Sequence, residues 1–231
     1  MKAILTYFLL LSLSGYSQNK NHQITNYLIL GLLHDYNGRS FYNSIKNQLD
    51  HFYPFEKPLV EFIDSLLTEE NRKPNVLIKQ EHFYIISKPL AKFVNSFYTF
   101  KTDSTYTMTD TSKDKDELVY LGRLNPLSVS DSIYLRYFIV GNYIRFGKII
   151  DDSYSLQFVN SVSKSTYFLK LITQLGCTEI TTKFIDAIPS STIIQFKPTI
   201  ELRNYLEKYE YLRKRITESY SNYKHKKMPI S

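Results

Sequence analysis

The sequence predicts a mainly α-helical fold with a few short β-strands (α+β), built as compact helical lobes. Apolar residues recur at intervals of three and four over most of the chain. Glycine or proline stands at the ends of these stretches, and only short runs are rich in β-branched residues. We expect one globular domain over 18–231. The alternative is two lobes, 22–100 and 118–223, joined by the polar segment 101–117.

Residues 1–17 predict a secretory signal peptide. Lys2 precedes an apolar run of suitable length, and the small residues Gly15 and Ser17 fit the −3 and −1 positions of a cleavage site before Gln18. The run is shorter than the roughly 20 apolar residues that cross a bilayer. We therefore expect export to the bacterial periplasm or the extracellular space, with no transmembrane span in the mature chain.

Composition limits the partners. The chain has 231 residues, a formal net charge of +7 and one cysteine, Cys177. A single thiol forms no internal disulfide, whereas animal secreted domains usually carry several, which favours the bacterial envelope. A basic balance indicates an anionic partner, but an exported protein rarely meets nucleic acid, so we expect none. At most, Lys224, Lys226 and Lys227 in the basic tail make weak peripheral contact with a membrane.

The first half of the chain is dominated by helical patterns. Helices are predicted over 23–36, ended by Asn37-Gly38, over 40–53, over 58–70 and over 89–100. In the second of these, Phe41, Ile45, Leu49 and Phe52 would share one face. Between the third and fourth, the runs 75–80 and 82–87 predict a β-hairpin.

The second half is more ambiguous. The polar segment 101–117 predicts an exposed loop or hinge, although Tyr106 to Thr109 also fits an edge strand. Helix is favoured over 133–150, with Asn142, Arg145 and Lys148 on one polar face, but a buried strand also fits. The segment 178–188 stays open between helix and strand. The remaining expectations are a helix over 165–175, a strand over 191–196, a helix over 199–220 and no internal repeat.

Two Ser-x-x-Lys patterns are the nearest approach to a catalytic motif. They are Ser112 to Lys115 and Ser161 to Lys164. This spacing puts a lysine amine one helical turn from a serine hydroxyl, as in penicillin-binding enzymes. About two matches are expected by chance in a chain this rich in serine and lysine, and the companion motifs of those enzymes are missing. No catalytic residue is therefore assigned.

Metal and cofactor sites are not predicted either. The five histidines include no pair at helical ligand spacing. Asp110, Ser112 and Asp114 alternate as in a calcium loop, but Lys115 stands where that loop needs glycine. Cys177 is interpreted as a buried structural thiol. No cofactor is expected.

These observations favour an exported, non-catalytic envelope or secreted protein that acts by binding another protein, as an inhibitor or accessory factor. The alternative is an exported serine-type hydrolase acting on cell-wall or glycan substrates, with Ser161 and Lys164 as its reactive pair.

Overall fold

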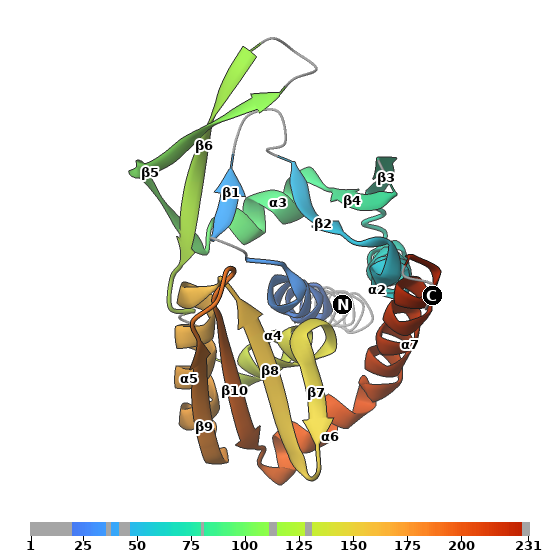
Figure 1. Cartoon of the computed structure of the whole chain (residues 1–231). Helices are drawn as coiled ribbons and strands as arrows, with labels where there is room; N and C mark the ends of the chain where they lie inside the picture. The colour runs from blue at the N-terminus through green and yellow to red at the C-terminus, as the bar shows by residue number, and fades with distance from the viewer. Residues whose placement is uncertain are drawn as a thin grey trace, which may run out of the picture.

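The computed structural model describes residues 20–35, 38–41, 47–79, 81–110, 115–127 and 131–227. Within this part, ten strands form three antiparallel sheets beside the helices (Figure 1). The prediction of a mainly α-helical fold is therefore wrong. The signal-peptide prediction, with cleavage between Ser17 and Gln18, lies outside the described residues and stays a prediction. No helix in the described part is long and apolar enough to span a bilayer.

The helices comprise an N-terminal helix through residues 20–32, η2 (Pro54–Glu56), α2 (Lys57–Glu69), α3 (Lys88–Asn95), α4 (Ser132–Phe146), α5 (Val162–Gln174), α6 (Ile200–Lys208) and α7 (Glu210–Lys227). The strands are β1 (Arg39–Phe41), β2 (Gln48–Phe52), β3 (Asn75–Lys79), β4 (His82–Ile86), β5 (Tyr98–Asp110), β6 (Lys115–Leu124), β7 (Gly147–Ile150), β8 (Ser153–Val159), β9 (Thr178–Ile185) and β10 (Ser191–Lys197).

The order of elements occurs twice, contrary to the prediction of no internal repeat. The first unit runs from the 20–32 helix through β1, β2, α2, β3 and β4 to α3, and the second from α4 through β7, β8, α5, β9 and β10 to α6. The sheets agree as well, because the order β2-β4-β3 corresponds to β8-β10-β9. The hairpin of β5 and β6 lies between the two units and extends away from the body of the molecule (Figure 1).

The two units meet where their first helices cross at glycine. A Cβ on Gly31 would lie 2.2 Å from the carbonyl oxygen of Phe138, and a Cβ on Gly141 would lie 2.1 Å from that of Leu28. Each of these partners stands three residues before the opposite glycine, so the contact is symmetric. Both positions therefore require glycine, because any side chain would force the backbones apart.

Each unit buries one face of its sheet. Leu156 on β8 pairs with Ile194 on β10, and both side chains are fully buried. Helices α4 and α5 cover this face, while the opposite face is turned towards the viewer in Figure 1. In the first unit, Phe52 and Ile85 are buried in the same way. The opposite face of the β7-β8-β10-β9 sheet is not covered by any helix of the described part in Figure 1, although α7 flanks it at Lys148.

Three segments correct the sequence-based prediction. The segment 40–53, expected to be a helix, contains β1 and β2 instead. Residues three apart normally point to opposite faces of a strand, but a bulge near Gln48 turns both Leu49 and Phe52 inward. The segment 178–188 contains the strand β9, and its spacing of four residues fits one face of a strand as well as of a helix.

Within the polar segment 101–117, the described residues 101–110 and 115–117 belong to strands β5 and β6 rather than to a loop. Strand β5 lies at the edge of its sheet, which confirms the alternative interpretation of Tyr106 to Thr109.

Other predictions are confirmed. Helix α2 matches 58–70, strands β3 and β4 pair as a hairpin, and β10 matches 191–196. The helix favoured over 133–150 is α4, followed by β7. Helix α5 begins after Ser161 rather than at Ser165, and the last predicted helix is broken at Tyr209 into α6 and α7.

Candidate functional site

A cluster of buried charged side chains lies where the two crossed helices end. Its members come from both units and carry three positive and three negative formal charges. They are Asp35, Arg39, Asp50, Glu56, Arg145 and Lys164. A buried charge is costly unless it is paired or hydrogen-bonded, so the partners of each member decide what the cluster can do.

Arg145 at the end of α4 pairs with two carboxylates of the first unit. Its Nε lies 2.7 Å from Glu56 Oε1, and its NH1 lies 2.6 Å from Asp50 Oδ2. NH1 also donates to the carbonyl oxygen of Leu32 at 2.9 Å. Burial alone would lower the pKa of this guanidinium, but Glu56 and Asp50 outweigh burial and raise it. Burial alone would likewise raise the pKa of Asp50, but Arg145 holds it below its usual value. Arg145 therefore joins the two units through compensated charges.

Lys164 on α5 holds the end of the 20–32 helix. Its Nζ donates to the carbonyl oxygens of Gly31 at 2.9 Å and Leu33 at 2.5 Å. These carbonyls have no partners within the helix, and a cation near a helix C-terminus is favoured by the helix dipole. Burial lowers the pKa of Lys164 to about 7, and the nearby Asp35 opposes that shift.

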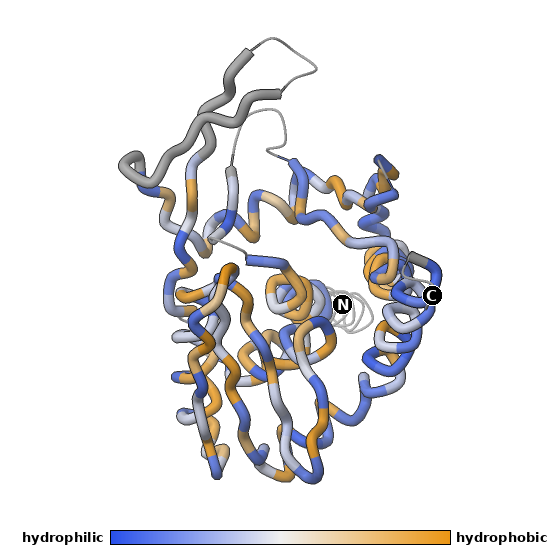
Figure 2. The backbone as a smooth tube through the Cα atoms, viewed as in Figure 1, coloured by the Kyte–Doolittle hydropathy of each residue, from blue (hydrophilic) through white to orange (hydrophobic). Residues whose placement is uncertain are grey.

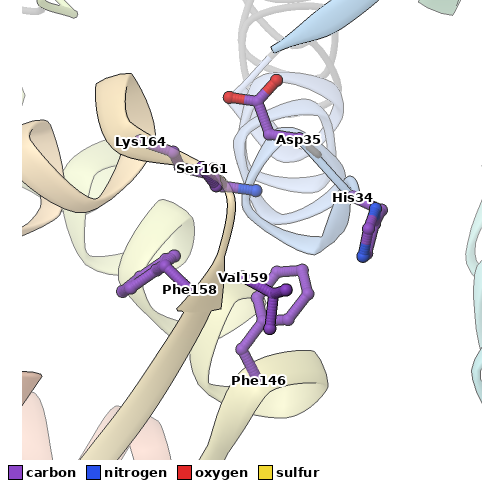
Figure 3. Close-up of a pocket in the computed structure, with 7 residues that line it drawn as sticks. All are labelled: His34, Asp35, Phe146, Phe158, Val159, Ser161 and Lys164. Carbon is purple, nitrogen blue, oxygen red and sulfur yellow. The ribbon is translucent and has the colours of Figure 1, made fainter. Parts of the chain in front are cut away.

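Asp35 borders a small cavity of about 20 Å³, room for roughly one water molecule. The cavity is lined by His34, Asp35, Phe146, Phe158, Val159, Ser161 and Lys164 (Figure 3). Neither carboxylate oxygen of Asp35 has a hydrogen bond of ordinary geometry to a described residue. Burial raises the pKa of Asp35 to about 6, and Lys164 and Arg39 pull it back down.

The structure brings Ser161 and Lys164 to this same cavity (Figure 3). Ser161 Oγ is buried and has no hydrogen-bond partner in the described part of the chain, while Lys164 donates to two carbonyls. The cavity admits no substrate larger than water. Ser161 and Lys164 are therefore not hydrogen-bonded to each other as a nucleophile and its base would be. Of the other Ser-x-x-Lys pattern, Ser112 lies outside the described residues.

His34 is a site residue that sequence reasoning missed. Its backbone N–H donates to Asp50 Oδ2 at 2.5 Å, and its ring lies 6.1 Å from that of His51. Burial, followed by the positive charge of Arg145, lowers the pKa of His34 to about 4. The imidazole is therefore neutral at physiological pH.

The polar face predicted for 133–150 is also corrected. Asn142 is fully buried and Arg145 is 6% exposed, whereas Lys148 is exposed on β7. The Asn142 side chain donates to the Phe138 carbonyl at 2.8 Å. A polar residue in an apolar helix of this kind signals a buried polar contact, but only the structure shows its partner.

No group of three or more His, Cys, Asp or Glu side chains in the described part of the chain is arranged to hold a metal ion. Cys177 is buried, and burial raises the pKa of its thiol, which disfavours the reactive thiolate.

The second candidate site is the open face of the β7-β8-β10-β9 sheet. One row across all four strands consists of Lys148, Ser155, Gln195 and Thr181. The neighbouring row across β8, β10 and β9 consists of Gln157, Ile193 and Lys183. Every side chain in these two rows except Ile193 can form hydrogen bonds. Ser155 is buried, however, and Gln157 Nε2 already donates to Ser191 Oγ at 3.1 Å.

The charge on this face is positive. Glu179 and Asp152 both form ion pairs with Lys197. The Lys197 Nζ lies 2.9 Å from the Glu179 carboxylate and 3.1 Å from that of Asp152. These contacts raise the pKa of Lys197 and lower that of Asp152. Within the described residues, neither Lys148 nor Lys183 forms an ion pair. Lys183 is exposed, whereas Lys148 lines a cleft of about 310 Å³ together with Glu210 and Glu218 of α7.

No family model and no curated protein matches the chain. Among solved structures, a crystal structure of the homing endonuclease I-DmoI in complex with DNA and Ca is similar to it. The two share 14% sequence identity over 83% of this chain and 90% of that chain, with a TM-score of 0.48. This finding stands against the sequence-based prediction that excluded a nucleic-acid partner, but the DNA is bound by that protein and not by this chain.

Proposed function

We propose that this chain is a nucleic-acid-binding protein that contacts a duplex through the open face of the β7-β8-β10-β9 sheet. The observation that carries the proposal is the pair of polar rows on that face, which include Lys148 and Lys183, two lysines that form no ion pair within the described residues. The net charge of +7 adds a long-range attraction to phosphate.

The side chains in the rows are of the types that contact nucleic acids. Lysine, threonine and glutamine bind phosphate oxygens, and glutamine can also bind the edge of adenine in the major groove. Gln157 and Gln195 lie between the two lysines in the register of the sheet, so phosphate and base contacts are both available on one surface.

The width of the two central strands of the sheet suits this role. Neighbouring strands are about 4.8 Å apart, and the major groove, about 12 Å wide, admits a two-stranded β-ribbon. The two central strands, β8 and β10, pair over six residues, from Ser191 with Val159 to Phe196 with Tyr154.

A protein partner is a weaker match for this face. The centres of protein interfaces are enriched in aromatic residues and depleted of lysine, whereas Ile193 is the only large apolar side chain in the two rows. The expectation of an exported protein that binds another protein therefore stays a prediction, and so does export itself.

The buried charge cluster has a structural role in this proposal. Asp50 and Glu56 are paired with Arg145, and Asp35 lies beside Lys164. These pairings hold the two units in one arrangement, which keeps the open sheet face in a fixed position.

The test is the affinity for a fluorescently labelled DNA duplex, measured by anisotropy at low salt. We expect Lys148→Gln with Lys183→Gln to weaken binding roughly tenfold or more. Lys170→Gln is the matched control, because this exposed lysine lies on α5, on the covered side of the sheet. Absence of duplex binding by the wild-type protein, or equal losses in the control, would overturn the proposal.

A further inference from the structure

An aromatic array covers part of the first unit. It lies away from the two polar rows of the second unit, which contain Lys148 and Lys183. Its rings lie on β2, β4, η2, α7 and the residue that joins β2 to η2, in an unbroken series of ring contacts. The members are His51, Tyr53, Phe55, His82, Tyr84, Tyr220 and Tyr223. His51 and Tyr84 are paired across β2 and β4 on the face opposite the buried Phe52.

The array is continuous from the sheet to the last helix. Ring centroids are 5.8 Å apart between His51 and Tyr53 and 5.4 Å apart between Tyr53 and Phe55, whose planes are 3° from parallel. Phe55 then meets Tyr220 at 5.0 Å and Tyr223 at 5.8 Å. The mutual contacts restrict the rings, so a ligand that stacks on them has little ordering cost to overcome.

Several rings of the array remain open to solvent. Tyr53 is 37% exposed, Tyr220 is 49% exposed, and the side chain of His51 is 42% exposed. Core aromatics such as Phe52 and Phe168 are fully buried in the same protein. The exposed rings therefore offer apolar surface that the fold itself does not use.

The charge at the α7 end of the array is positive. Helix α7 is mostly hydrophilic (Figure 2), and its last turns carry the exposed residues Lys224, His225 and Lys226 with no acidic residue from Tyr220 to Lys227. Glu56, next to Phe55, is buried and paired with Arg145. The exposed acidic residues near the array are Glu81, next to His82, and Glu218, two residues before Tyr220.

We infer that the aromatic array binds single-stranded nucleic acid, with bases stacked on Tyr53 and Tyr220 and phosphates near the lysines at the end of α7. Exposed aromatic rings beside cations are the arrangement that single-strand binders use, because every base has a π-face and every nucleotide a negative charge. A lipid surface or an acidic protein would satisfy the lysines but leave the exposed rings without stacking partners. This surface differs from the duplex-binding sheet face in its residues and in its unit.

The test compares two ligands of equal length, a thymidine oligomer of about ten nucleotides and the same phosphodiester chain without bases. Stacking contributes about 1–3 kcal/mol per base, which corresponds to roughly 5- to 150-fold in affinity. We expect the thymidine oligomer to bind at least about fivefold more tightly than the abasic chain. Tyr53→Leu with Tyr220→Leu should remove this preference.

Tyr211→Leu is the matched control, because Tyr211 is an exposed tyrosine on α7 outside the array. Lys148→Gln with Lys183→Gln should weaken duplex binding and leave the thymidine preference unchanged, which separates the two proposals. Equal affinity for thymidine and abasic ligands, or the same loss in Tyr211→Leu, would overturn the single-strand assignment whatever the duplex result. A wild-type protein that binds acidic peptide as tightly as thymidine would also overturn it.

Discussion

The two units share their order of elements but differ in the charge at the end of their first helix. Gly31 and Gly141 occupy equivalent places in the helix crossing. Four residues further on, the first unit has Asp35 and the second has Arg145, both buried. Because opposite charges stand at equivalent positions, the repeated fold determines where a charged group is buried. The partners available in each unit determine whether that charge is positive or negative.

The sheets of the two units also differ in which strands they pair. In the second unit β7 pairs with β8 and completes a four-stranded sheet, whereas in the first unit β1 pairs with β6 of the long hairpin. The open face of the second unit carries lysine and glutamine, and the corresponding face of the first carries histidine and tyrosine. We interpret this divergence as a division of binding roles, duplex on one sheet and single strand on the other.

The largest expected effect comes from breaking the charge pairing that joins the units. Arg145→Leu would leave Asp50 and Glu56 buried without their cation, and we expect a loss of about 3–5 kcal/mol in the free energy of unfolding. Denaturant titration measures it. Arg215→Leu is the control, because Arg215 and Glu61 form an exposed pair for which at most about 1 kcal/mol is expected. Equal losses in the two variants would contradict the pairing.

The helix crossing provides the next test. Gly31→Ala and Gly141→Ala each place a methyl group against backbone, and we expect each to lower the free energy of unfolding by about 1–3 kcal/mol or more. The two losses should be similar, because the contacts are symmetric. Thr166→Ala on the exposed side of α5 serves as the control. A large loss at one glycine and none at the other would show that the crossing is not shared.

A smaller effect is expected from the acid at the end of the first helix. The pKa of Asp35 is about 6 in the folded protein, against an ordinary value of 3.8 for an aspartate exposed to water. As pH rises between these two values, ionisation of Asp35 therefore favours the unfolded state. The stability of Asp35→Asn relative to wild type should therefore increase by roughly 2 kcal/mol from pH 4 to pH 6 and level off above that. Denaturant titrations across this range measure the difference. Parallel curves for the two proteins would show that Asp35 titrates normally.

Sequence reasoning identified α2, the β3–β4 hairpin and β10, because their patterns are local. It failed over 40–53, where a bulge reverses the inward positions of a strand, and a bulge has no signature in the spacing of apolar residues. The repeat left only a trace, Tyr-x-Ile-x-Gly at Tyr27 to Gly31 and again at Tyr137 to Gly141. Three shared residues in a chain with twenty tyrosines do not stand out from composition.

The charge cluster was beyond prediction for a different reason. Lys164 and Arg145 are 19 residues apart in sequence, yet both donate to carbonyls at the end of the 20–32 helix, more than a hundred residues away. Sequence shows a cation in an apolar stretch, but the partner depends on how the two units pack. The same holds for the open sheet face, whose rows are set by the register of four strands.

The central claim is that Lys148 and Lys183, in the two polar rows of the second unit, bind the phosphates of a duplex. Its most direct test is the dependence of affinity on salt, because each phosphate contact contributes about 0.9 to the slope of log K against log salt concentration. For Lys148→Gln with Lys183→Gln we predict a slope shallower than that of wild type by about 2. An unchanged slope, equal to that of Lys170→Gln, would contradict the claim.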